Sequence, residues 1–223
     1  MRPKLEVSQT QKPVSGALLN WWAIHQRSYP WRAEKDPYRI LIAEVMLHRT
    51  RADQVAKIYN HFVLRYPTIA DLARAKPVDL LRILKPLGLR WRARLVSEMG
   101  RMIHERYHDQ VPQSAESLKS LPGVSDYIAA AVQCFAFAMP TAILDTNTVR
   151  VTGRIFGLPI SDSSRRKDEF RTRYVLLQDP TRASDFNLAM IDLAALLCRP
   201  LNPRCQICPI SEDCEFGRSQ MAR

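Results

Sequence analysis

The chain has 223 residues, of which 46% are hydrophobic, so it can bury a core as one compact unit or two small lobes. It carries 33 Lys and Arg against 22 Asp and Glu, and the net charge of +11 indicates a polyanionic partner such as nucleic acid. A basic surface kept for solubility is the alternative. The sequence contains neither an apolar run of about 18 residues nor an apolar segment at its start, which predicts a cytoplasmic protein without a membrane span.

Apolar residues recur at helical spacing along most of the chain, and alternating runs typical of strands are scarce. The predicted fold class is therefore all-α. Residues 1–15 are polar and contain proline, which predicts a flexible tail. We expect the next segment, Val14 to Gln26, to be a helix that leads into an ordered loop around Trp31.

A helix is predicted to begin at Asp36 and Pro37 and to continue to Thr50, because Asp is a good N-cap and Pro a good first residue. Glu44 lies among apolar residues of this helix. Burial favours the protonated form of a carboxylic acid, as a general acid requires. The alternative is an ordinary ion pair of Glu44 with Arg39 or Arg51.

An apolar residue, Leu89, follows Gly88 and is flanked by Arg90, Arg92 and Arg94. This pattern suits a wedge that enters a DNA duplex, with cations for the phosphates on either side. A leucine that covers the edge of a core is the alternative.

A helix, a tight turn and a second helix are predicted between residues 114 and 140. Ser114 can cap the first helix, Pro122–Gly123 breaks it, and Ser125 or Asp126 can open the second. The start of a helix has unpaired N–H groups and the positive end of the helix dipole, so such a hairpin can bind a phosphate through its backbone. An ordinary turn between two packed helices is the alternative.

Asp145 follows the apolar run TAIL and precedes the helical pattern TNTVRVTGRIF, so it is predicted to be an N-cap. Backbone N–H groups would then stabilise the carboxylate, which would stand ready where a positive charge develops. A cap without a chemical role is the alternative.

Four cysteines cluster near the end of the chain with the spacing C-x6-C-x2-C-x5-C, whereas Cys134 lies apart on an apolar helix and is expected in the core. Clustered thiols in a chain without an export signal indicate a metal site rather than disulfides. The spacing alone is compatible with zinc and with a cubane iron–sulfur cluster. The four ligands are Cys198, Cys205, Cys208 and Cys214.

The motif LPGV-x-x-Y at Leu121–Tyr127, followed by LDTNTVRV from Leu144, resembles the helix–hairpin–helix DNA glycosylase superfamily of the endonuclease III and MutY type. The resemblance covers about Trp21 to Cys214. It is strongest to the mismatch thymine glycosylases and next to the MutY-type adenine glycosylases. One departure is Ser125, where the family usually has a second glycine, so a position that often needs a positive φ would carry a Cβ.

The resemblance implies a two-lobed fold with an iron–sulfur cluster loop. The implied domains are a cluster domain of residues 16–36 plus 146–223 and a helical barrel domain of residues 37–145 that contains the hairpin. In this family a [4Fe–4S] cluster shapes a DNA-binding loop, and the four clustered cysteines would hold it.

The resemblance also implies roles for single residues. Glu44 matches the acid of the adenine and thymine enzymes. His48 and Arg49 occupy the place where the family inserts side chains beside the extruded nucleotide; the adenine enzymes have Gln-Gln there. Because an arginine can donate two hydrogen bonds to guanine, this basic pair favours a guanine opposite the lesion. A solvated helix end is the alternative.

The hairpin residues Gly123, Val124 and Ser125 are implied to bind DNA. Asp145 would stabilise the sugar cation, and Asn147 would orient the water or the sugar. Tyr127 would stack on or hydrogen-bond to the flipped nucleotide, with a core tyrosine as the alternative. It occupies the place of the lysine with which endonuclease III opens the sugar, and a phenol cannot form a Schiff base. The resemblance therefore predicts a monofunctional enzyme.

The expected activity is removal of thymine, or uracil, opposite guanine from duplex DNA by a monomer. The MutY-type enzymes usually carry a further C-terminal domain, and this chain ends nine residues after Cys214, which favours thymine over adenine. An adenine glycosylase acting on A·G or A·8-oxoguanine is one alternative. A catalytically silent DNA-binding protein is another.

Overall fold

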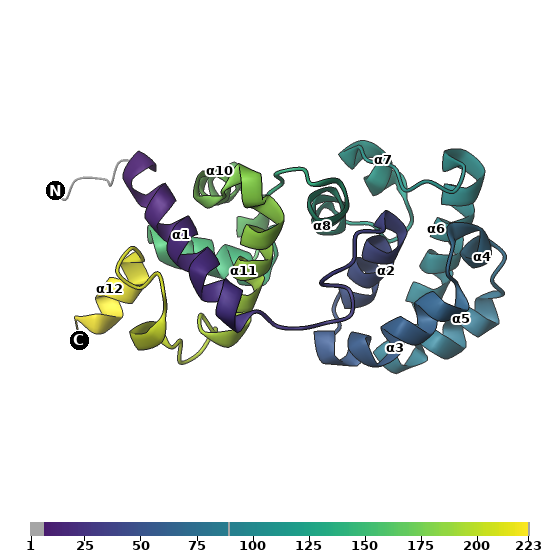
Figure 1. Ribbon diagram of the computed structural model, residues 1–223, viewed down its shortest axis with the longest axis horizontal. Helices are drawn as coiled ribbons and strands as arrows, with labels where there is room; N and C mark the ends of the chain where they lie inside the picture. Colours follow the sequence, from purple (N-terminus) through teal and green to yellow (C-terminus); the bar gives the residue numbers. More distant parts are fainter. Residues whose placement is uncertain (1–6, 89, 223) are drawn as a thin grey trace. The chain divides into compact units, whose positions relative to one another are not determined.

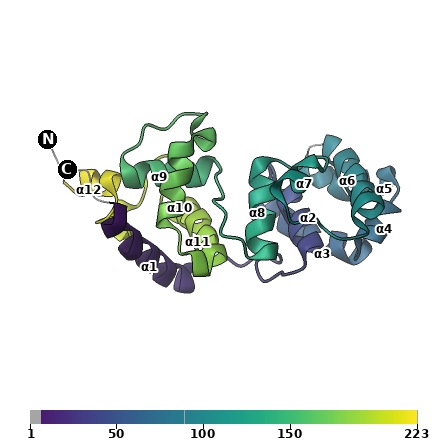
Figure 2. The same ribbon diagram turned by 90° about the horizontal axis from the view of Figure 1, so that it is seen from above.

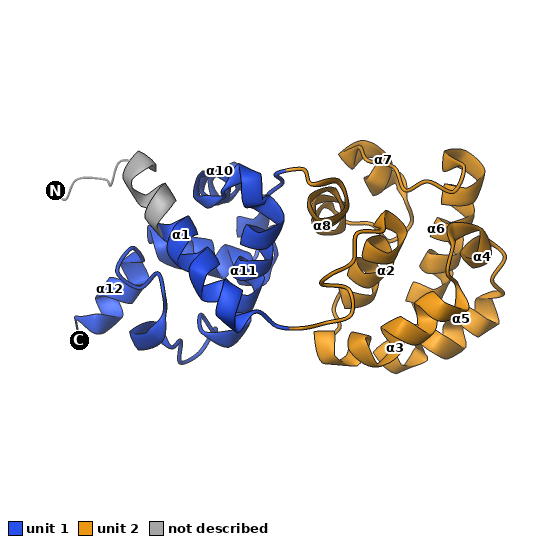
Figure 3. Cartoon of the chain, in the orientation of Figure 1, with its two compact units in different colours: residues 1–27, 140–223 blue, residues 28–139 orange. Residues whose placement is uncertain are grey.

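The computed structural model describes residues 7–88 and 90–222, with side chains from residue 14 onward (Figures 1 and 2). Within these ranges the chain forms helices and no β-strand, which confirms the predicted all-α class. It divides into two compact units (Figure 3). Unit 1 comprises residues 1–27 and 140–223, and unit 2 comprises residues 28–139.

Unit 2 is built from α-helices and one short 3-10 helix around an apolar core. Its elements are α2 (Pro37–Leu47), α3 (Ala52–Arg65), α4 (Ile69–Ala73), α5 (Pro77–Leu84), η1 (Lys85–Leu87), α6 (Trp91–Tyr107), α7 (Ala115–Ser120) and α8 (Asp126–Phe137). Leu41, Phe62 and Met99 are fully buried in this core, and each such side chain contributes about 1.5–3 kcal/mol. Helix α2 packs against α8 (Figures 1 and 2).

Unit 1 has its own core, formed around the first helix of the chain and the helices that follow residue 140. Its elements are α1 (Val7–His25), α9 (Thr146–Phe156), η2 (Ser164–Arg166), α10 (Asp168–Leu177), η3 (Pro180–Arg182), α11 (Ala183–Leu196), η4 (Cys205–Ile207) and α12 (Glu215–Met221). Leu18, Tyr174 and Phe186 are fully buried here. No helix in the described chain combines the length and apolar character needed to cross a membrane.

The first boundary between the units lies at 27/28 rather than at the predicted 36/37. The buried Asp192 of α11 explains the difference: it accepts hydrogen bonds from Trp22 Nε1 (3.0 Å) and from Arg27 N (3.1 Å) and Nε (2.7 Å). The following loop instead packs in unit 2, where the rings of Trp31 and Tyr59 lie edge to face with a centroid distance of 5.5 Å.

The second boundary lies at 139/140 rather than at the predicted 145/146. The extended segment before α9 is anchored by Asn187, a fully buried residue of α11. Its side chain donates to Thr141 O (3.1 Å) and accepts from Ile143 N (3.3 Å). These hydrogen bonds join the segment that leads to Asp145 to unit 1.

Helix α1 begins at Val7 rather than at Val14, so residues 7–15 of the predicted tail are helical. Polar composition suggested a tail, but Gln and Lys are good helix formers and do not oppose a helix. Residues 1–6, the rest of the predicted tail, lie outside the described residues.

Candidate DNA-processing site

The turn between α7 and α8 is formed by local hydrogen bonds. Leu121 N–H donates to Leu118 O and Val124 N–H donates to Leu121 O, both at 3.1 Å. Gly123 has φ of +82°, in the left-handed region that favours glycine. Within the described chain, the N–H groups of Gly123 and Ser125 donate to no protein acceptor. They remain available for a phosphate oxygen.

Ser125 is the N-cap of α8, and its hydroxyl accepts a hydrogen bond from Ile128 N at 3.3 Å. Its φ of −89° is ordinary extended backbone, so the expected difficulty of a Cβ at this position is not present. Val124 differs from its neighbours because its side chain is buried and its N–H serves the turn. Any phosphate contact of the hairpin would therefore involve Gly123 and Ser125.

Tyr127 lies in the first turn of α8, where it is half-buried and packs against the core of unit 2. Glu44 lies on α2, the neighbouring helix, and is only 5% exposed, which confirms its predicted burial. Arg39 pairs with Glu34 at 3.3 Å and Arg51 with Asp53 at 3.6 Å, so both proposed ion-pair partners of Glu44 contact another carboxylate. The fold thus brings the helices of Tyr127 and Glu44 together in one unit.

Helix α2 ends at Leu47 rather than at Thr50, and a turn follows it. Arg49 in this turn is exposed and has φ of +56°, which is strained for a residue with a Cβ. The half-buried His48 places its ring edge to face with Trp91, at a centroid distance of 6.3 Å. Its pKa lies below the usual value because of burial and of the nearby charges of Arg49 and Arg92. The ring is therefore mainly neutral at pH 7, and Arg49 alone carries the charge of the predicted basic pair.

The predicted wedge, Leu89, lies outside the described residues. Of its flanking arginines, Arg90 is exposed and Arg94 pairs with Glu98 at 2.8 Å. Arg92 is 1% exposed, and its guanidinium donates to protein acceptors. The prediction that all three arginines serve phosphates is wrong for Arg92, because a helical arginine can also turn inward when carbonyl groups receive it.

Asp145 is the N-cap of α9, as predicted, and lies in unit 1. Its Oδ1 accepts from Asn147 N (2.9 Å), Thr148 N (2.7 Å) and Thr148 Oγ1 (3.1 Å). Its Oδ2 accepts from Asn147 Nδ2 at 2.7 Å. Thr148 Oγ1 also receives Asp145 N–H at 2.9 Å, which completes a capping box. Four hydrogen bonds therefore fix this half-buried carboxylate at the positive end of a helix dipole.

Asn147 is linked to the cysteine loop through Arg150, a buried residue that the sequence analysis did not identify. Arg150 Nη1 donates to Asn147 Oδ1 (3.1 Å), Nε to Cys198 O (2.9 Å) and Nη2 to Ala194 O (3.1 Å). The i, i+3 spacing of Asn147 and Arg150 on one helix was the available signal. Burial lowers the pKa of this arginine, and the Cys198 thiol beside it acts in the opposite direction.

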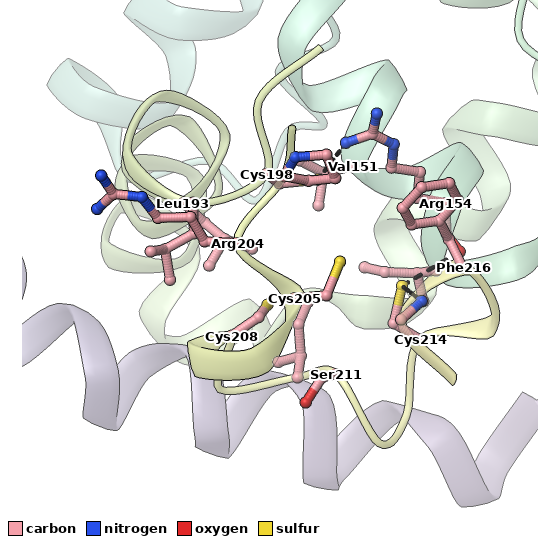
Figure 4. Close-up of a pocket in the computed structure, with 15 residues that line it drawn as sticks. Val151, Arg154, Leu193, Cys198, Arg204, Cys205, Cys208, Ser211, Cys214 and Phe216 are labelled. Atoms are coloured by element: carbon pink, nitrogen blue, oxygen red, sulfur yellow. Dashed lines mark hydrogen bonds between the residues drawn. The ribbon is translucent and has the colours of Figure 1, made fainter. Parts of the chain in front are cut away.

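The four clustered cysteines line one pocket of unit 1 (Figure 4). Arg154 Nη1 donates to Cys198 Sγ at 3.3 Å, and its guanidinium lies 4.5 Å from the centre of the Phe216 ring. Cys214 Sγ donates to Arg154 O at 3.2 Å. None of the five cysteines, all of which lie in the described ranges, forms a disulfide, and Cys134 is buried in unit 2 as expected. Among the residues described, no three His, Cys, Asp or Glu side chains are grouped as a site for one metal ion.

Burial raises the pKa of the Cys208 thiol to about 12 and that of the Cys214 thiol to about 11. Burial also raises the pKa of the Cys205 thiol. Neighbouring cysteines act in the same direction at each of these sites. Without a bound cation these thiols are protonated at neutral pH, so binding of a metal would release protons.

Comparison with known proteins identifies the family of this chain. The HhH-GPD superfamily of base excision DNA repair proteins matches residues 42–174, more than half of the chain. The chain belongs to this family. A thymine/uracil-DNA glycosylase of Methanothermobacter thermautotrophicus is 33% identical over 210 residues, which are 94% of this chain and 95% of the relative.

The chain is also similar to a thymine-DNA glycosylase of known structure and to an adenine DNA glycosylase. A solved structure of a thermostable thymine-DNA glycosylase has a TM-score of 0.87 and 32% identity, and covers 95% of this chain and 98% of its own. An adenine DNA glycosylase of Mycolicibacterium smegmatis is 35% identical over 87% of this chain and 66% of the relative. The predicted family is confirmed, and the order of the two branches agrees with the prediction.

Proposed function

We propose that this chain is a monofunctional DNA glycosylase that removes thymine, or uracil, opposite guanine from mismatched duplex DNA. The observation that carries this proposal is Asp145, a carboxylate fixed by hydrogen bonds at a helix start in a member of a base excision repair family. The full-length similarity to a thymine/uracil-DNA glycosylase supports the choice of base.

A stacked duplex shields its glycosidic bonds, so the nucleotide has to leave the stack before the reaction. The bond between the sugar carbon and the base nitrogen then breaks, and its electron pair leaves with the base. Asp145 would stabilise the positive charge that develops on the sugar. Water supplies a hydroxyl to that carbon and a proton to the base. Asn147 would orient the water or the sugar, and Glu44 would donate the proton or position a water that does.

A panel of five duplexes tests the proposed substrate. Release of free base is measured under single-turnover conditions from duplexes containing T·G, U·G, A·G, A·8-oxoguanine and T·A pairs. We expect thymine and uracil release opposite guanine. Release of adenine alone would overturn the proposal in favour of the adenine glycosylase, for which the similarity to the mycobacterial relative is the specific support. Binding to DNA without release from any duplex would indicate a silent DNA-binding protein.

The monofunctional character rests on Tyr127, because only an amine can form the Schiff base that precedes strand cleavage. Borohydride should trap no covalent complex between the wild-type protein and substrate DNA. Tyr127→Lys should give a trapped complex and cut the strand, which would place residue 127 at the sugar. A trapped complex with the wild-type protein would contradict the monofunctional assignment.

We further propose that the four cysteines hold a [4Fe–4S] cluster. Their thiols line one pocket together with Val151, Leu193 and Phe216. The spacing supports a cubane cluster over zinc, because zinc sites more often have two short Cys pairs, whereas this chain has one C-x2-C pair with longer arms. The bound cluster would cross-link the loop between α11 and α12. Elemental analysis should find four irons per chain, and zinc without iron would refute the assignment.

The proposed partner is a mismatched duplex, bound by a monomer on the nucleoid in the cytoplasm. The charge of +11 supports attraction to DNA, and the free N–H groups of Gly123 and Ser125 support contact with a phosphate. His48 and Arg49 would contact the bases at the lesion, with Arg49 directed to guanine.

A further inference from the structure

Arg92 is the largest fully buried side chain of the described residues. It lies in the first turn of α6, between two arginines that are exposed. A buried guanidinium needs acceptors for its N–H groups, because removal of a charge from water is costly. The acceptors of Arg92 therefore identify the part of the chain that its buried guanidinium stabilises.

All three acceptors belong to the end of α2 and the turn that follows it. Arg92 Nη1 donates to Met46 O at 2.9 Å, and Nη2 donates to His48 O and to Thr50 Oγ1, the latter at 3.1 Å. The last carbonyl groups of a helix have no partner within the helix, so the guanidinium replaces the missing donors. Its planar fork reaches all three acceptors at once, which a lysine cannot do.

The carbonyl and hydroxyl that Arg92 binds flank Arg49, whose φ of +56° is strained. A strained residue keeps its conformation only where its neighbours are fixed. Trp91, the residue before Arg92, contacts the His48 ring from the same helix turn. The start of α6 thus holds the residues on either side of Arg49 and the ring of His48.

We infer that Arg92 is a positioning residue for recognition of the base opposite the lesion: it fixes the turn of His48–Thr50 so that Arg49 meets that base in one orientation. The inference rests on the proposed function, because it assumes that this turn contacts the duplex. Arg92 itself touches neither base nor sugar in this assignment. Its effect is on the choice of partner base and not on the chemical step.

The test compares affinity for two duplexes that contain a tetrahydrofuran abasic analogue opposite guanine or opposite adenine. We expect the wild-type protein to prefer guanine and Arg92→Lys to lower this preference roughly tenfold, about the discrimination of one bidentate arginine contact. Thr50→Val, which removes one acceptor and conserves shape, should lower it less. Arg101→Lys, an exposed arginine of the same helix, should leave it unchanged.

A purely structural role for Arg92 would weaken binding to both duplexes equally and leave the ratio unchanged. An unchanged ratio in folded Arg92→Lys overturns the inference, as does a wild-type protein without preference for guanine. If Arg92→Lys does not fold, Thr50→Val decides the matter alone. Because the test measures affinity, it gives a result even if no base is released, whereas absence of base release from T·G and U·G counts only against the proposed function.

Discussion

The helix starts at Ser125 and at Asp145 have the same kind of N-cap, but one cap is neutral and the other is negatively charged. Each residue is an N-cap in extended backbone whose side chain accepts a backbone N–H of the first turn. Ser125 makes one such bond, at 3.3 Å, and is neutral. Asp145 makes two with its first turn, at 2.9 and 2.7 Å, and bears a carboxylate.

This difference in charge suits the two helix starts to two different tasks, binding of a phosphate and stabilisation of a cation. A neutral cap leaves the positive end of the helix dipole and the N–H groups of Gly123 and Ser125 open to an anion, as a phosphate requires. A carboxylate cap compensates the dipole and adds a negative charge, which suits a cation on the sugar and repels a phosphate. The residue at the cap therefore decides whether a helix start binds the backbone or assists the chemistry.

The largest expected effect is that of Asp145→Asn. Asparagine caps a helix about as well as aspartate, so stability should change by less than about 1 kcal/mol. Removal of the charge should lower the single-turnover rate at least about 100-fold, by analogy with loss of one preorganised electrostatic group. Affinity for substrate DNA should persist.

The matched control is Asp36→Asn, the same substitution at the N-cap of α2, where Asp36 accepts from Tyr38 N at 2.8 Å. It should leave the rate near that of the wild type. If Asp145→Asn keeps a near-normal rate, Asp145 is only a cap, and the contrast between the two helix starts has no chemical meaning.

The second prediction concerns a negative charge placed at the start of α8, like the one that Asp145 places at the start of α9. Ser125→Asp should still cap α8, but its carboxylate should repel a phosphate and lower affinity for duplex DNA roughly tenfold at low salt. Ser114→Asp adds the same charge at the N-cap of α7, where Ser114 accepts from Ser117 N at 3.0 Å. It should change affinity much less. Equal losses in the two variants would mean that general charge, and not this helix start, governs binding.

The caps were predictable from sequence because their signals are local. Asp36, Ser114 and Asp145 each precede a helical pattern by one residue, and the structure confirms all three as caps. Ser125 was one of two candidates, and the structure selects it over Asp126, which instead pairs with Lys119 at 3.1 Å. The all-α class followed in the same way from spacing that a short window contains.

The parts that sequence did not predict depend on contacts distant in the chain. Arg92 looks like its exposed neighbours until the carbonyl groups at the end of α2 are placed beside it. The first unit boundary depends on the hydrogen bonds between Arg27 and Asp192, 165 positions apart. Arg150 joins Asn147 to Cys198 only after α9 and α11 have packed. Apart from the i, i+3 spacing of Asn147 and Arg150, no local pattern contains this information.

The third prediction concerns Gly123, in the turn between α7 and α8. Gly123→Ala forces a Cβ into φ of +82° and places it 3.2 Å from Leu95 Cδ1. The left-handed conformation alone should cost about 1–2 kcal/mol in the free energy of unfolding. Gly16→Ala, in helix α1, meets no atom within 4 Å and should instead stabilise by about 0.5–1 kcal/mol. Urea titration followed by circular dichroism measures both, and a loss of equal size at Gly16 would contradict the conformational explanation.

The smallest expected effect comes from Ser125→Gly, which introduces the residue that the family usually has here. Replacement of a serine N-cap by glycine lowers the free energy of unfolding by only a few tenths of a kcal/mol. Ser125→Ala should lower it by about 1 kcal/mol, because alanine is a poor N-cap and accepts no hydrogen bond from the first turn. Since the N–H groups of Gly123 and Ser125 bear the proposed phosphate contact, both variants should keep near-normal affinity for DNA. Denaturant midpoints and binding isotherms for the pair test this. A large loss of affinity in Ser125→Gly would show that the hydroxyl itself binds the phosphate, and the neutral helix start would then act through its side chain, as the one at Asp145 does.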